Sequence, residues 1–85
     1  MASKKVTVDK INYDVFEENN GLTFYPRTKD DAIKMHRLGQ NGVVDSVMDM
    51  LNIKFGRNRF YYKAGKHIDE GLHFKYNTES ILDRL

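Results

Sequence analysis

The chain has 85 residues and a mass of 10.0 kDa, which is enough for one small domain. It contains no cysteine, so disulfides and thiolate-based metal sites are excluded. Its hydrophobic fraction of 40% can supply a modest core, which disordered tails lack. No signal-peptide or membrane-spanning pattern occurs. We expect a single cytoplasmic domain over residues 1–85, with residues 1–4 as a flexible basic N-terminus.

The formal net charge of +2 is distributed unevenly along the chain. Residues 11–53 carry four basic and seven acidic side chains, whereas residues 54–66 carry five basic side chains and no acidic one. A local excess of positive charge favours binding to polyanions. The segment 54–66 is therefore the first candidate for a functional region.

Two runs of alternating apolar residues predict two short strands joined by a tight turn at residues 9 and 10. The alternating residues are Val6, Val8, Ile11, Tyr13 and Val15. Asn and Gly at positions 19–21 tolerate the positive φ of hairpin turns, so a third strand with Leu22 and Phe24 should follow. The first 26 residues are thus expected to form a three-stranded meander.

Two helices are predicted next, separated by Gly39. Thr28 has the side chain of an N-cap, and Gly39 is suited to end the first helix. His36 falls on the apolar stripe of that helix and should be partly buried there. Asn41 is expected to cap a second helix, whose apolar residues recur with a helical period. These residues are Val44, Val47, Met48, Leu51 and Phe55.

A second pair of strands and a short terminal helix complete the expected order. Alternation returns over residues 59–64 and again over residues 72–76, with Leu72 and Phe74 on the inner side. Thr78 should cap a helix that contains Ile81, Leu82 and Leu85. The predicted fold class is α+β, in the order β-β-β-α-α-β-β-α, with an antiparallel sheet of about five strands packed against helices.

The basic segment and the following strand provide the candidate binding residues. If the apolar residues of both strands face the core, the intervening basic and aromatic residues project together from the other face. Cations there could hold phosphates while Tyr61 stacks on a base. The predicted nucleic-acid contacts are Lys54, Arg57, Arg59, Tyr61, Lys63, Lys66, His73 and Lys75, with Lys4 and Lys5 as possible additions. A solvated sheet face with no ligand explains the same pattern equally well.

Neither a metal centre nor a catalytic site is expected. The residues His67, Asp69, Glu70 and His73 have metal-binding side chains, but their spacing matches no common zinc or calcium site. No nucleophile elbow or phosphate-binding glycine loop occurs. The sequence therefore predicts a non-enzymatic protein without a cofactor.

In its size, its lack of cysteine and its basic character, the chain resembles small phage proteins that disable host defences. It is similar in these respects to the toxin-inhibitory RNA-binding type of T-even phages, which counters ToxN-like endoribonucleases of type III toxin–antitoxin systems. The resemblance rests on no aligned motif and assigns no role to any residue. It implies RNA and a host toxin nuclease as joint partners.

Two hypotheses about function follow from the sequence. The first is a non-enzymatic nucleic-acid-binding protein that prefers RNA or another single strand, because aromatic residues on a sheet suit unpaired bases. The second is a small inhibitor or adaptor that binds a host protein without nucleic acid. Self-association through the predicted C-terminal helix is a further expectation.

Overall fold

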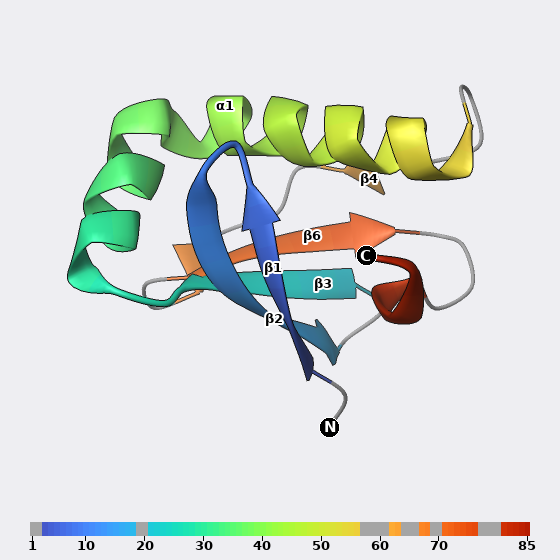
Figure 1. Ribbon diagram of the computed structural model, residues 1–85, viewed down its shortest axis with the longest axis horizontal. Coiled ribbons are helices and arrows are strands. Elements are labelled where there is room, and N and C mark those ends of the chain that lie inside the picture. Colours follow the sequence, from blue (N-terminus) through green and yellow to red (C-terminus); the bar gives the residue numbers. More distant parts are fainter. Residues whose placement is uncertain (1–2, 19–20, 57–61, 64–66, 69–70, 77–80) are drawn as a thin grey trace.

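The computed structural model describes residues 3–18, 21–56, 62–63, 67–68, 71–76 and 81–85. It confirms the α+β class, with one antiparallel sheet and one long helical segment (Figure 1). The elements are β1 (Ser3–Val8), β2 (Ile11–Glu18), β3 (Gly21–Pro26), α1 (Lys29–Phe55), β4 (Tyr62–Lys63), β5 (His67–Ile68), β6 (Gly71–Tyr76) and the 3₁₀ turn η1 (Leu82–Arg84). Within these described segments, no helix is long and apolar enough to cross a bilayer.

The sheet has the order β1-β2-β3-β6-β4, and β5 also pairs with β6. The predicted meander is confirmed, because β1 pairs with β2 and β2 with β3, all antiparallel. Strand β6 lies beside β3, so the second half of the chain supplies a central strand. The predicted strand over residues 59–64 appears only as the two residues of β4, and Arg59 and Tyr61 lie outside the described residues.

Helix α1 bends at Gly39, where the sequence predicted the boundary between two helices. Gly39 has φ 78° and ψ 165°, which interrupts the helical backbone, and Figure 1 shows the two halves running in different directions. Asn41, predicted to be a cap, lies within the second half. The expected burial of His36 is wrong: its side chain is exposed, while Met35 beside it is buried.

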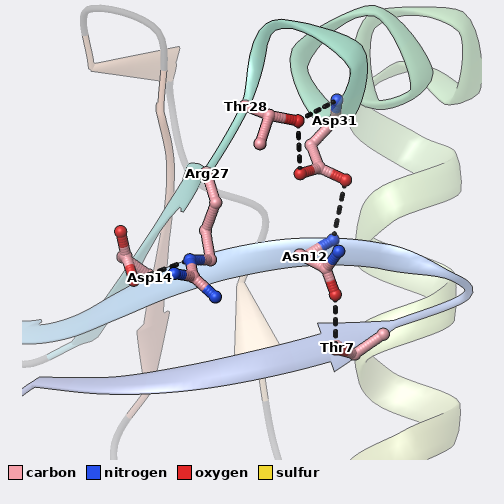
Figure 2. A network of polar contacts seen from close by, with 6 residues as sticks. All are labelled: Thr7, Asn12, Asp14, Arg27, Thr28 and Asp31. Carbon is pink, nitrogen blue, oxygen red and sulfur yellow. Dashed lines mark hydrogen bonds and ion pairs between the residues drawn. The ribbon is translucent and has the colours of Figure 1, made fainter.

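A network of polar contacts fixes the start of α1 to the sheet (Figure 2). The backbone N–H of Asp31 donates to Thr28 Oγ1 at 3.1 Å, which confirms the predicted N-cap. The Asp31 carboxylate accepts the Thr28 hydroxyl at 2.7 Å and the backbone N–H of Asn12 in β2 at 3.1 Å. These hydrogen bonds lower the pKa of Asp31 below its usual 3.8, and the one from the Thr28 hydroxyl has the largest effect.

We call the side of the sheet that packs against α1 the covered face. Its central residues are fully buried together with Val47 and Leu51 of α1; on the sheet they are Tyr13, Val15, Leu22, Phe24, Leu72 and Phe74. Burial, reinforced by the negative charges of Asp31 and Asp9, raises the pKa of Tyr13 to about 12. The covered face is thus the hydrophobic core.

The C-terminal residues also belong to the core. Ile81, Leu82 and Leu85 are buried, and the described helical structure there is only the turn η1; Thr78, the predicted cap, lies outside the described residues. The Lys54 ammonium group donates a hydrogen bond to the carbonyl of Leu85. Self-association through these apolar side chains would therefore require the turn to leave the core.

Candidate nucleic-acid interface on the outer face of the sheet

We call the opposite side of the sheet the outer face. Strand alternation assigns to it every second residue, including Lys5 in β1, Phe16 in β2 and Tyr25 in β3. In β6 the outer positions are His73 and Lys75. In the described part of the chain, neither α1 nor η1 packs on this face, because their buried side chains join the core on the other side.

An aromatic pair lies near the middle of the outer face. The rings of Phe16 and Tyr25 meet edge to face with centroids 5.6 Å apart, and both side chains are half-buried. The Tyr25 ring also lies against Gly71, where a Cβ atom would be only 2.7 Å from two ring carbons. Glycine at position 71 therefore lets Tyr25 lie flat across the neighbouring strand. The pair presents partly exposed aromatic surface held in a fixed place.

A chain of hydrogen bonds lies beside the aromatic pair. The Thr23 hydroxyl is 3.2 Å from Glu18 Oε1 and 2.7 Å from His73 Nδ1. A hydroxyl has one proton, so if Thr23 donates to the carboxylate it must accept from Nδ1–H of His73. The proton-bearing nitrogen of the neutral imidazole is then Nδ1. Its Nε2 is buried and has no hydrogen-bond partner among the residues that the structure describes.

The environment of His73 favours the neutral ring. Burial is the largest cause that lowers its pKa, and the positive charge of Lys75 acts in the same direction, while Glu18 opposes both. The ring edge also packs against Gly21, where a Cβ would lie 3.0 Å from Cε1 and Nε2. The predicted face of His73 is right, but its expected exposure is wrong: only 5% of the residue is accessible. His73 is therefore a nearly buried residue of the outer face, held by Thr23.

Among the described residues of this face, basic positions outnumber acidic ones. Lys63 in β4 is the register partner of Lys75 in β6, so two lysine positions are directly opposite each other. Like charges in that position destabilise a sheet unless an anion lies between them. Asp14 forms an ion pair with Arg27 at 3.5 Å, and its register partner in β1 is Lys5. The basic positions are Lys5, Arg27, Lys63 and Lys75, and the acidic ones are Asp14 and Glu18.

The structure brings only part of the predicted site together. Lys75 is exposed on the outer face, and Lys63 has its backbone there. Lys54 lies at the end of α1 and contacts Leu85 instead. Strand β1 begins at Ser3, so Lys4 and Lys5 lie within a strand. Both residues are exposed. The predicted contacts outside the described residues are Arg57, Arg59, Tyr61 and Lys66.

Phe16 and Tyr25 were missed as candidate site residues, although the sequence contains the signal. Alternation places Val15 on the inner side, which leaves Phe16 on the outer side, and the same parity argument applies to Phe24 and Tyr25. The concentration of positive charge after residue 54 is the stronger signal in the sequence, and this pair lies outside that segment.

The described residues offer no cluster of three or more metal-binding side chains; Asp69 and Glu70 lie outside them. The outer face therefore combines aromatic surface with basic positions, which is chemistry suited to bases and phosphates. Comparison with protein-family models, with curated proteins and with solved structures finds no match to this chain.

Proposed function

We propose that this protein is a non-enzymatic RNA-binding protein that uses the outer face of its sheet. The observation that carries the proposal is the half-buried Phe16–Tyr25 pair, which lies on a face bordered by Lys5, Lys63 and Lys75. Unpaired bases stack on aromatic side chains, and lysines neutralise the adjoining phosphates. A sheet face lacks the protruding helix that reads a duplex major groove, so single-stranded RNA fits best.

The lysine positions on β4 and β6 give the proposal its electrostatic part. Two register partners of the same charge are unfavourable in the free protein. A bound phosphate would remove that repulsion and gain two ionic contacts. Binding should therefore become weaker as salt concentration rises.

The experiment measures binding of a fluorescent single-stranded RNA of mixed sequence at several salt concentrations. In the variant Lys63→Gln/Lys75→Gln, the slope of log K against log salt should become shallower by about 1.4, since each phosphate contact contributes about 0.7. The matched control is Lys29→Gln/Lys34→Gln, which removes the same charge from exposed positions of α1. Equal slopes in the two variants would refute the assignment of the outer face.

The aromatic part is tested separately with Tyr25→Leu, which keeps an apolar side chain over Gly71 while removing the ring. Loss of one stacked base should weaken binding by about 1–3 kcal/mol with no change in the salt slope. Leu22→Ile, a core change of similar size, is the control for indirect effects on the fold. Unaltered affinity of folded Tyr25→Leu would rule out stacking on this ring.

The absorbance of purified protein provides an independent check. The chain has five Tyr and no Trp, so co-purified RNA would dominate the spectrum at 260 nm and disappear after RNase treatment. A clean spectrum, together with no RNA affinity, would favour the alternative of a protein-binding inhibitor or adaptor. Cleavage of RNA by a ToxN-like endoribonuclease, with and without the protein, tests the anti-defence role that the resemblance implies.

A further inference from the structure

A concave surface lies between the β1–β2 turn and the second half of α1. It is a hollow of about 340 Å³. Figure 1 shows the turn reaching the middle of α1. The apolar part of the lining consists of Val8, Met50 and Ile53, and the polar part includes Asp9, Ser46 and Asp49.

The helical residues of the lining share one flank of α1. Ser46, Asp49, Met50 and Ile53 have the spacing i, i+3, i+4 and i+7. Met50 also packs against the core, as do Val44, Met48 and Phe55 on the opposite flank of the helix. The apolar surface of α1 therefore extends beyond the core, from Met50 to the exposed Ile53, on the side of the β1–β2 turn.

Ile53 is the most exposed large apolar residue of the described chain, at 84%. Single exposed apolar side chains are common on protein surfaces. Ile53 differs because it lies at the edge of a hollow with Met50 and Val8 behind it. Val8 is already buried, so a partner that filled the hollow would remove the accessible surface of Met50 and Ile53 from water.

The charge of the lining determines which partner fits. Asp9 and Asp49 form no ion pair among the described residues, and no basic side chain lines the hollow. Two carboxylates beside an apolar floor complement a cation attached to an apolar group. RNA would be repelled from this surface, so it differs in kind from the outer face.

The rim of the hollow is held in position before any partner arrives. Asp9 and Lys10 have φ values of 51° and 63°, the left-handed conformation that a two-residue hairpin turn requires. The Ser46 hydroxyl lies 3.5 Å from Asp9 Oδ2 and points the turn toward α1. A preformed rim loses little conformational entropy on binding.

We propose that this hollow binds a short segment of a partner protein in which large apolar residues are flanked by Lys or Arg. The apolar side chains of the partner pack on Met50 and against Ile53 at the edge of the hollow, and the flanking cations lie against Asp9 and Asp49. This surface is distinct from the RNA-binding proposal, because it shares only Thr7 with the outer face and includes none of that face's aromatic or basic residues.

The test uses the whole protein without RNA and two synthetic octapeptides, one with Leu residues flanked by Lys and the other with Glu in place of every Lys. Backbone amide signals are followed by ¹⁵N–¹H NMR during titration. The Lys peptide should shift the signals of Val8, Asp9, Asp49 and Ile53 saturably, and the Glu peptide should not. Equal binding of both peptides, or shifts confined to the outer face, would overturn the proposal.

Two variants with matched controls locate the site. Asp9→Asn/Asp49→Asn and Ile53→Ser should each weaken binding of the Lys peptide by about tenfold; Asn is tolerated at the positive φ of position 9. The controls Asp45→Asn and Ile33→Ser change exposed residues of α1 outside the hollow and should bind normally. Unchanged affinity in both test variants would overturn the proposal.

Two further outcomes separate this inference from its competitors. Concentration-dependent shifts at the hollow without any peptide would identify a second copy of the chain as the occupant and refute a foreign partner. Lys63→Gln/Lys75→Gln should retain peptide binding even where it loses RNA binding. Loss of peptide binding in that variant would contradict two independent surfaces.

Discussion

The two faces of the sheet are built from the same strands but differ in what they bury. On the covered face, Phe24 packs edge to face against Tyr13 and Phe74, with ring centroids 5.4 Å and 5.1 Å away. On the outer face, Thr23 is buried to the same extent, yet it lies in a chain of hydrogen bonds with Glu18 and His73. Adjacent residues of β3 thus belong to an apolar core and to a polar network.

We therefore expect the covered face to contribute mainly to folding stability and the outer face mainly to binding. Apolar burial is non-directional and contributes in proportion to area, so the covered face can supply most of the folding free energy. The outer face contributes less, because its aromatic rings remain partly exposed and Lys75 is exposed. Substitutions on the two faces should therefore have different consequences.

The largest contrast is expected between Phe24→Ala and Phe16→Ala. Phe24 is fully buried, so its truncation should lower the free energy of unfolding by about 3–5 kcal/mol. Phe16 is half-buried against Tyr25, and its truncation should cost about 1–2 kcal/mol. Urea denaturation followed by circular dichroism measures both. If Phe24→Ala does not fold, Phe24→Leu replaces it; a loss no larger than that of Phe16→Ala would contradict the contrast.

Gly39→Ala should have the next largest effect, because it acts on how α1 reaches the covered face. The backbone at φ 78° and ψ 165° is essentially restricted to glycine. A Cβ at position 39 would meet no atom within 4 Å, so the cost of about 1–3 kcal/mol is one of backbone strain. Thermal unfolding measures it, with Gly42→Ala as the control for steric contact. A stability equal to that of the parent would show that the bend is not required.

The smallest effect is the pH dependence caused by His73. The unfolded chain binds a proton at the usual histidine pKa of 6.5, while burial lowers the pKa in the folded protein. Folding stability should therefore decrease as pH falls below 6.5, by at most about 1.4 kcal/mol per pH unit. His73→Gln should remove that slope, and His36→Gln should keep it, because His36 is exposed. Identical slopes in both variants between pH 7.5 and 5.5 would refute a buried neutral His73.

The sequence allowed the covered face to be predicted better than the outer face. Alternating apolar residues, a turn at residues 9–10 and an N-cap at Thr28 are local signals, and the structure confirms them. Burial of His73 could not be predicted, because it depends on pairing with Thr23 and on the small size of Gly21 in a distant strand. The hollow beside Ile53 depends on where the β1–β2 turn meets α1, which is also a long-range property.

The central position of β6 has a consequence for how the chain folds. Thr23 in β3 and its partner His73 are 50 positions apart, so this pairing closes a long loop and forms slowly compared with local hairpins. Until β6 arrives, the edge of β3 is unpaired. At high concentration that edge can accept the same strand from another chain, exchanging β6 between molecules. Refolding yield should consequently fall with protein concentration, even though the finished sheet has β3 in its interior.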